Sequence, residues 1–288
     1  MRVLLTGARG FVGSYFLQKY NNSYEIRTFS FLRDKRENLS LCDIDVVVHL
    51  SALVHQMGGA DEEEYYRINV EQTLALAKQA KREGVKHFVF MSSIKVCGEE
   101  SEKVYDQHTK CLPQDGYGKS KREAEKQLLA LEDEYFCVSI IRTPIVYGYG
   151  VKANIANLVH LVEKVPFLPF GDIENKRSMI YVGNLCFIID TIVRKRIQGV
   201  FFVADDELLS TKEFIYAIAQ ALSKTIMLPH IFGFAFVLKH LKPSFYKRLY
   251  GSLKVDNTAM KQKLFGSCDV PLPYTVEEGI YCMIHGEQ

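Results

Sequence analysis

A glycine-rich turn directly after the first apolar run constrains the fold of this chain more than any other feature. The apolar run covers residues 2–5, and three glycines follow it at a spacing of three residues. The first two let the backbone turn tightly and approach a phosphate, and the third lets a helix pack closely on the strand with its first amides directed at an anion. A loop that merely needs glycines would show the same spacing, but here alternating strands and helices follow. The sequence therefore predicts a dinucleotide-binding turn formed by Gly7, Arg9, Gly10, Phe11, Val12 and Gly13.

The rest of the first half alternates between buried strands and helices. Apolar runs typical of strands buried on both faces occur at 46–50, 87–91 and 137–141, and helical patterns occur at 62–83 and 120–134. This order predicts an α/β fold with a Rossmann-type doubly wound parallel sheet. A second strand at 25–30 leaves fifteen residues before the next one, so we expect a shortened crossover there.

The second half is more helical and less regular, with frequent proline turns. We therefore expect a Rossmann core at 1–147 and a smaller, mostly helical C-terminal substrate lobe at 148–288. At least one strand of the lobe, at 200–204, is expected to return to the core sheet.

Charge and cysteine usage limit the partners. Lys and Arg number 36 against 34 Asp and Glu, a net charge of +2, so no sequence-wide basic field points to nucleic acid and a small molecule is the expected partner. Seven dispersed cysteines without a CxxC pair argue against a disulfide framework and a zinc site, and favour a reducing cytoplasm. We expect no signal peptide, because Met1 and Arg2 lead straight into the first strand. We expect no transmembrane segment, because no apolar stretch reaches the roughly 18 residues that a membrane span requires.

A tyrosine and a lysine one helical turn apart carry the predicted chemistry. Tyr117 and Lys121 point the same way at the start of a helix, and the lysine charge is expected to lower the pKa of the phenol toward the working range. Their helix follows the strand that ends in Ser92 and Ser93, at the sheet edge where ligands bind.

Two other pairs in the chain have the same spacing. Tyr15 and Lys19 lie within the first helix, and Tyr250 and Lys254 lie in the irregular C-terminal part. We expect Tyr15 to face away from any site, and Tyr250 lies in an irregular segment, so we assign catalysis to Tyr117 and Lys121.

Eight segments in a specific order resemble those of one family. They are TGARGFVG (6–13), HLSA (49–52), YRINV (66–70), SSIKV (92–96), YGKSK (117–121), RTPIVYG (142–148), VKAN (151–154) and RSMIYVGNL (177–185). Together they resemble the extended short-chain dehydrogenases/reductases that modify nucleotide sugars. The segments 92–96 and 113–121 look most like those of bacterial reductases acting on UDP-4-keto-6-deoxy-N-acetylhexosamines in surface-polysaccharide synthesis. UDP-hexose 4-epimerases are close relatives of these reductases.

The resemblance implies roles for the catalytic residues. Ser93 would hydrogen-bond the C4 oxygen of the sugar, Tyr117 would transfer its proton, and Lys121 would bind the nicotinamide ribose. Ser92 is placed with Ser93 on the substrate side. The alternative for Ser93 is a strand-end serine that only caps the next turn, and such a structural role suits Ser92 better than Ser93.

Further residues are assigned to cofactor and substrate by the same resemblance. Leu50, Ser51 and Ala52 would line the adenosine and phosphate path, and Asn69 would brace the active-site helix or the cofactor unless it is simply a satisfied buried amide. Asn154 and Arg177 would contact the nucleotide diphosphate. Arg177 has the alternative of a surface salt bridge to Asp172 or Glu174, and His49 is expected to be structural.

Two departures from the family pattern refine the reaction. Dehydratases of the family carry an Asp-Glu pair where Ile94 and Lys95 stand, so 4,6-dehydration is disfavoured. Cys97 replaces the usual tyrosine before Gly98, and we expect buried packing of its thiol rather than reactivity.

The cofactor choice rests on the end of the second strand. Ser30 stands where an acidic residue would accept the adenosine 2′-hydroxyl of NAD. Arg9 and Arg33 could neutralise a 2′-phosphate, so NADP(H) is favoured over NAD(H), although Asp34 keeps NAD open.

The leading hypothesis is a cytoplasmic NADP(H)-linked 4-ketoreductase of a UDP-sugar. The alternatives are a 4-epimerase with tightly held NAD and a non-catalytic dinucleotide sensor. Relatives often dimerise, so a homodimer is possible. The apolar stretch 229–242, with its basic end, is expected to pack in the core of the lobe, with a membrane surface as the alternative.

Overall fold

The computed structural model describes residues 1–54, 61–99 and 103–287. Its centre is a six-stranded sheet in the order β2-β1-β3-β4-β6-β9, in which all neighbouring strands are parallel. The strands are β1 (Arg2–Thr6), β2 (Glu25–Phe29), β3 (Val46–His49), β4 (His87–Ser93), β6 (Cys137–Thr143) and β9 (Gly199–Phe202). The predicted Rossmann-type, doubly wound parallel sheet is confirmed.

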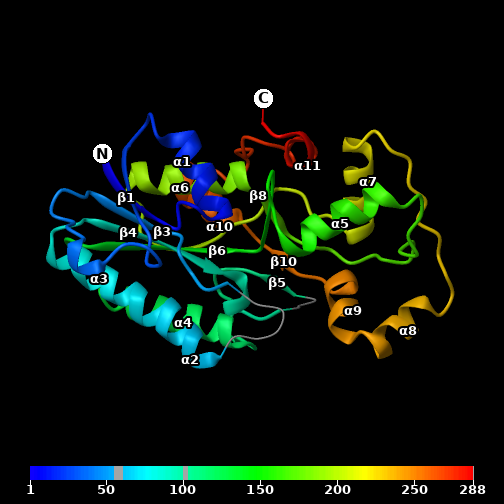
Figure 1. Ribbon diagram of the computed structural model, residues 1–288, viewed down its shortest axis with the longest axis horizontal. Helices are drawn as coiled ribbons and strands as arrows, with labels where there is room; N and C mark the ends of the chain where they lie inside the picture. The colour runs from blue at the N-terminus through cyan, green and yellow to red at the C-terminus, as the bar shows by residue number, and fades with distance from the viewer. Residues whose placement is uncertain (55–60, 100–102, 288) are drawn as a thin grey trace.

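Helices cover both faces of this sheet (Figure 1). One face carries α1 (Phe11–Tyr20), α6 (Val182–Lys195) and α10 (Thr258–Phe265), and the other carries α3 (Gln72–Arg82) and α4 (Gly116–Leu129). The chain passes from β2 to β3 with only a 3-10 turn at Arg36–Asn38, as the short spacing predicts. The order of the strands reverses between β1 and β3, and ligands of open α/β sheets bind at the carboxyl ends of such strands.

Two predicted helices have different bounds in the structure. The pattern at 62–83 forms α2 (Glu62–Tyr66), a π-helical turn at Arg67–Glu71 and then α3. The helix expected from residue 120 begins at Gly116, because the Asp115 carboxylate accepts a 2.6 Å hydrogen bond from the Gly118 amide and caps it.

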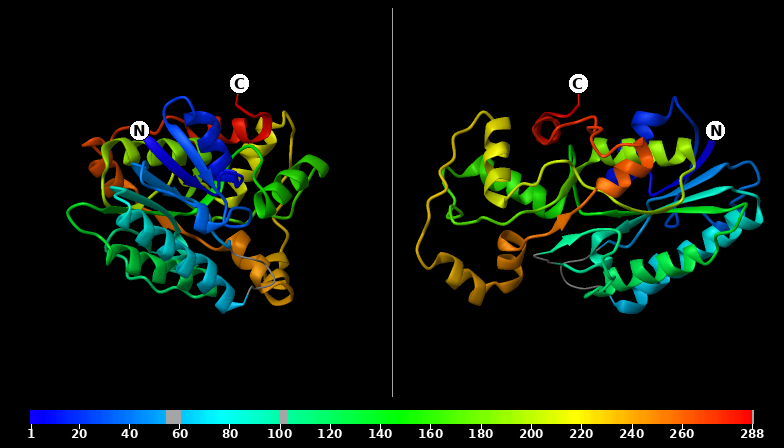
Figure 2. Two further views of the ribbon diagram at one scale, coloured as in Figure 1. Left: turned by 60° about the vertical axis from the view of Figure 1, so that its left-hand side comes forward. Right: turned by 180° about the vertical axis from the view of Figure 1, so that it is seen from behind.

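The second half forms a smaller, mostly helical lobe beside the sheet (Figure 2). It contains α5 (Ala153–Lys164), α7 (Thr211–Ala221), α8 (Phe234–Leu241), α9 (Pro243–Tyr250) and α11 (Val276–His285). Short parallel pairs join β7 (Ile145–Tyr147) to β8 (Met179–Tyr181) and β5 (Val104–Tyr105) to β10 (Lys254–Val255). The strand expected to return to the core sheet is β9, and α6 before it packs on the same sheet. Both halves of the chain therefore contribute to the sheet layer, and we propose that the division into 1–147 and 148–288 separates cofactor binding from substrate binding.

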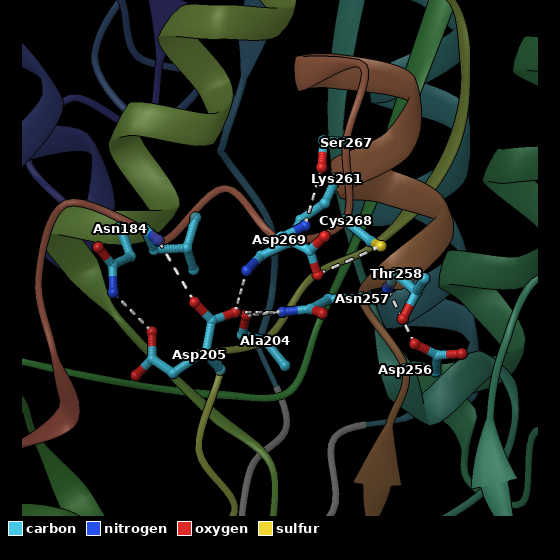
Figure 3. Close-up of polar contacts among 12 residues, drawn as sticks. Asn184, Ala204, Asp205, Asp256, Asn257, Thr258, Lys261, Ser267, Cys268 and Asp269 are labelled. Carbon is cyan, nitrogen blue, oxygen red and sulfur yellow. Dashed lines mark hydrogen bonds and ion pairs between the residues drawn. The ribbon is translucent and has the colours of Figure 1, made fainter.

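A polar junction directly after β9 ties the lobe to the sheet (Figure 3). The buried Asp205 carboxylate accepts hydrogen bonds of 2.8 Å from the Asn184 side chain and the Tyr147 hydroxyl. Burial raises the pKa of Asp205 to about 6. Beside it, the Asn257 side chain donates to the Ala204 carbonyl at 2.9 Å. The chain that leaves the sheet is thus fixed before it enters the lobe.

Candidate active site

The glycine turn lies at the carboxyl end of β1 and fits a dinucleotide diphosphate. Gly7 has a φ of +72°, and a Cβ there would come within 2.8 Å of the Leu50 and Ser51 backbone. A Cβ on Gly13 would run into the Gly7 carbonyl oxygen. Gly10 is the N-cap of α1 and offers no side-chain cap, so the first amides of the helix are available to an anion.

The loop after β3 lies directly against this turn. The Ser51 amide donates to Thr6 Oγ1 at 3.3 Å, and the Leu50 amide donates to the Thr6 carbonyl. This places residues 50–52 where the adenosine and phosphate path is predicted. His49 lies between two threonine hydroxyls, and burial lowers its pKa to about 3. It is therefore a neutral, structural histidine, as expected.

Asn69 braces α4, the helix that carries Tyr117 and Lys121. Its Oδ1 accepts from the Leu53 amide at 2.8 Å, and its Nδ2 donates to the Leu53 carbonyl and to Ser120 Oγ of α4, both at 3.0 Å. The side chain is 1% exposed and joins the loop after β3 to α4. Asn69 is thus a satisfied buried amide and a brace of the helix at once.

The two serines at the end of β4 face opposite ways, as neighbours on a strand do. Ser93 lines the cavity described below and is the N-cap of the following 3-10 turn, accepting from the Lys95 amide at 3.3 Å. Ser92 Oγ donates to the carboxylate of Glu125 at 2.6 Å and is 1% exposed. The structure therefore brings Ser93, and not Ser92, to the predicted substrate site.

Tyr117 lies in the first turn of α4, next to Ser93. Burial raises the pKa of Tyr117 to about 12, against the effect of a hydrogen bond with Ser93 that lowers it. The aromatic ring of Tyr65 packs edge-on against it, with ring centroids 6.1 Å apart. In this state the phenol carries its proton at neutral pH.

Lys121 lies one turn further along α4 and is buried beneath the strand end. Its Nζ donates to the Met91 carbonyl at 2.7 Å and lies 4.4 Å from the centre of the Phe90 ring. Burial lowers the pKa of Lys121 to about 7. The expectation that Lys121 lowers the pKa of Tyr117 is wrong for this structure, because burial of the phenol prevails and the ammonium is directed at a carbonyl.

The burial of Lys121 has a measurable cost. Since the pKa of Lys121 is about 7 in the fold and 10.5 in an exposed lysine, the unfolded chain binds more protons between these pH values, and stability rises with pH there. We expect Lys121→Met to be more stable than the wild type at pH 7 by about 2 kcal/mol or more, and this gain to shrink as pH rises toward 10.5. Urea unfolding at several pH values measures it. The exposed Lys126→Met is the matched control on α4, and a gain that does not change with pH would contradict the assignment.

A cavity of about 710 Å³ joins the sheet edge to the lobe. Its lining includes Ser93, Tyr117, Asn154, Arg177, Lys247 and Arg248. Arg177 Nη1 donates to the Arg248 carbonyl at 2.6 Å. Asp172, which the sequence suggested as a surface partner of Arg177, accepts from the Tyr250 hydroxyl. The predicted diphosphate contacts Asn154 and Arg177 thus face the same cavity as the predicted catalytic residues.

The segment after Ser93 lacks a dehydratase acid–base pair at the family positions. Ile94 is 3% exposed. Lys95 Nζ is 2.7 Å from the Glu99 carboxylate and 2.6 Å from that of Asp115. An alkyl chain and a paired ammonium therefore occupy the place of the acid and base.

The end of β2 presents a carboxylate that the sequence only partly indicates. Asp34 Oδ2 accepts from the Ser30 amide at 2.8 Å, so the acidic side chain folds back onto the strand end. Arg33 is exposed, as is Arg9 in the glycine turn. The end of β2 thus holds one carboxylate, with the exposed Arg33 next to it in the sequence and the exposed Arg9 in the glycine turn after β1.

A buried ion pair that was not predicted from the sequence lies behind the site. Arg142 of β6 contacts both carboxylate oxygens of Glu125 on α4, with Nε–Oε1 and Nη2–Oε2 distances of 3.0 and 2.7 Å. Cys97 is 5% exposed beside Arg142, and its hydrogen bond with Cys111, together with burial, raises the pKa of the Cys97 thiol. The expected packing role of Cys97 agrees with this setting. The only signal in the sequence was an arginine within a fully buried strand.

Residues 3–204 match the NAD dependent epimerase/dehydratase family. The chain belongs to this family. The resemblance to extended short-chain dehydrogenases/reductases is thereby confirmed, and the protein is an NAD(P)-dependent nucleotide-sugar enzyme of the epimerase/dehydratase family.

Two curated relatives of this family member are 4-epimerases. UDP-glucose 4-epimerase of Vibrio cholerae is 38% identical, with 96% of this chain and 92% of that protein aligned. N-acetyl-alpha-D-glucosaminyl-diphospho-ditrans,octacis-undecaprenol 4-epimerase of Escherichia coli O157:H7 is 28% identical, with 80% and 75% aligned.

Solved structures share the fold of this epimerase/dehydratase-family chain. UDP-glucuronic acid 4-epimerase from Bacillus cereus, in complex with NAD, has a TM-score of 0.77 at 20% identity and covers 99% of this chain and 98% of its own. dTDP-4-dehydrorhamnose reductase from Bacillus anthracis, in complex with NADP, has a TM-score of 0.78 at 19% identity and covers 100% and 99%. In the described part of the chain, no helix has the length and hydrophobicity to span a bilayer.

Proposed function

We propose that the protein is a 4-epimerase of a UDP-hexose or UDP-N-acetylhexosamine. The observation that carries the proposal is the juxtaposition of Ser93 and Tyr117 with Asn154 and Arg177 around one cavity. One nucleotide-sugar ligand could therefore contact the Ser93 and Tyr117 hydroxyls with its sugar and the Arg177 guanidinium with its diphosphate. The 38% identity with a UDP-glucose 4-epimerase over nearly the whole chain favours epimerisation over the other reactions of the family.

Each residue has a distinct task in this proposal. When bound, a nicotinamide dinucleotide accepts and returns hydride. Tyr117 takes the proton from the C4 hydroxyl and gives it back, and Ser93 hydrogen-bonds both the phenol and the C4 oxygen. Lys121 would contact the nicotinamide ribose. Tyr117 accepts the C4 proton as its phenolate, a state that requires another positive charge beside the phenol, because Lys121 is directed at the Met91 carbonyl. Arg177 and Asn154 hold the diphosphate, while the glycine turn and residues 50–52 hold the cofactor.

We propose NAD as the cofactor in place of the NADP(H) expected from Arg9 and Arg33. A carboxylate at the end of β2 accepts ribose hydroxyls and repels a 2′-phosphate, and Asp34 lies there against the Ser30 amide. We expect Asp34→Asn, which keeps an acceptor for that amide, to weaken NAD binding about tenfold and to strengthen NADP binding. Isothermal titration with both cofactors measures this. Arg33→Ala is the control. If Arg33→Ala lost affinity for NADP while Asp34→Asn left the affinity for both cofactors unchanged, NADP would be the cofactor.

A 4-ketoreductase is the second candidate, favoured by the likeness of segments 92–96 and 113–121 to UDP-4-keto-6-deoxy-N-acetylhexosamine reductases. It would use the same Ser93, Tyr117 and Lys121. Dehydration is not proposed, because Ile94 and the paired Lys95 occupy the acid and base positions. The seven free cysteines favour a reducing compartment, so we place the protein in the cytoplasm. We also propose that it is a homodimer.

The cofactor that copurifies with the protein tests the choice between the two reactions. An epimerase regenerates its cofactor in every turnover and retains it, so we expect about one equivalent of NAD per chain after denaturation. Enzymatic cycling assays specific for NAD and NADP identify it. Protein that copurifies without cofactor and prefers NADPH would favour the reductase.

A further inference from the structure

The outer part of the lobe presents large apolar side chains to solvent. Between residues 231 and 245, the exposed ones are Ile231 (44%), Phe232 (97%), Phe236 (67%), Val237 (51%), Leu241 (76%) and Phe245 (43%). Of the eight residues of α8, all described, none is buried. The expected packing of 229–242 in the core is therefore met only by part of the segment, where Phe234 and Leu238 contact the core and the Phe234 ring lies 6.2 Å from that of Phe170.

The same part of the chain carries only positive charge. From residue 214 to residue 255 the sequence has no Asp or Glu, whereas it has five lysines and one arginine. The whole chain has a net charge of only +2, so the excess is concentrated here. Lys239, Lys242 and Lys247 lie on or between α8 and α9, among the exposed apolar side chains.

The surface is held in place by α9 while α8 lies at the periphery. The Tyr250 hydroxyl donates to Asp172 at 2.9 Å, and Thr211 Oγ1 donates to the Leu249 carbonyl at 2.8 Å. Both views of Figure 2, like Figure 1, show α8 and α9 at the edge of the molecule, away from the sheet. An apolar surface with a basic rim is thus presented on an anchored support.

We propose that this α8–α9 surface, residues 231–248, binds a bilayer that contains anionic phospholipids. Exposed phenylalanines and leucine enter the boundary between headgroups and acyl chains, and lysines pair with lipid phosphates. Charge complementarity favours this occupant over a second copy of the chain, because a self-contact would bring the basic rims together. Lys247 and Arg248 also line the 710 Å³ cavity, so the membrane would lie beside the entrance to the active site.

Vesicle cosedimentation of the full-length protein tests the proposal. With phosphatidylethanolamine vesicles containing about one-third phosphatidylglycerol, we expect most of the wild-type protein in the pellet, and little of it with phosphatidylcholine vesicles or at high salt. The double variants Phe232→Ser/Phe236→Ser and Lys239→Glu/Lys242→Glu should each lower the partition coefficient at least about tenfold. Tyr135→Ser and Lys86→Glu, at exposed positions of the sheet domain, are matched controls that should bind like the wild type.

Three results would overturn the proposal. One is equal binding of the wild type to both kinds of vesicle, which does not depend on how any variant folds. Another is unchanged binding of both double variants with wild-type unfolding temperatures. The third is a dimer in sedimentation velocity that Phe232→Ser/Phe236→Ser dissociates, because a second copy would then cover the surface.

Discussion

Tyr117→Phe should lower kcat at least roughly 10²-fold while the protein keeps its fold and its affinity for the dinucleotide. The change removes only the hydroxyl that exchanges a proton with the sugar, and the ring that packs against Tyr65 stays. Steady-state turnover with UDP-glucose, together with titration of NAD, separates the two effects.

The chain offers a matched control for this experiment. Tyr15 is also four residues before a lysine, but its hydroxyl donates to Glu287 at the C-terminal end. Tyr15→Phe should therefore turn over at nearly the wild-type rate. Near-normal turnover of Tyr117→Phe would remove Tyr117 from the mechanism.

Glu125→Ala should destabilise the protein by about 3–5 kcal/mol. Glu125 is fully buried and neutralises the Arg142 guanidinium, whose side chain is only 6% exposed. Without the carboxylate, a buried charge is left uncompensated and Ser92 Oγ loses its acceptor. Urea denaturation, with the free energy extrapolated to water, measures the loss.

An exposed ion pair on the same helix provides the comparison. Lys119 of α4 and Glu62 of α2 are 2.8 Å apart, with side chains 55% and 69% exposed. Glu62→Ala should change stability by less than about 1 kcal/mol, because solvent screens such pairs. If Glu125→Ala cost no more than Glu62→Ala, the buried pair would not be the element that holds α4 to β6.

The sequence predicts those parts of the site that depend on neighbours close in the chain. The glycine turn needs only the spacing of Gly7, Gly10 and Gly13, and the position of Tyr117 follows from a helix start after a strand end. The helix was predicted to begin at residue 120, but Asp115 is a residue type that commonly caps helices, and its carboxylate accepts from the Gly118 amide at the true start.

Features that depend on distant partners could not be predicted. Ser92 was assigned to the substrate, but it faces Glu125, and the pattern of a fully buried strand does not tell its two faces apart. The pKa of Tyr117 was expected to fall because Lys121 is near in sequence. It rises because burial of the phenol and the bond from Lys121 to the Met91 carbonyl are properties of the packed structure.

The configuration at C4 tests the central claim most directly. Purified protein is incubated with UDP-glucose, and separately with UDP-N-acetylglucosamine, without added cofactor, and proton NMR follows the C4 epimer. We expect at least one of these sugars to convert to its C4 epimer until equilibrium is reached, with no net change in the bound NAD. Failure to convert either sugar, combined with consumption of NADPH when UDP-4-keto-6-deoxy-N-acetylglucosamine is supplied, would contradict epimerisation and establish the reductase in its place.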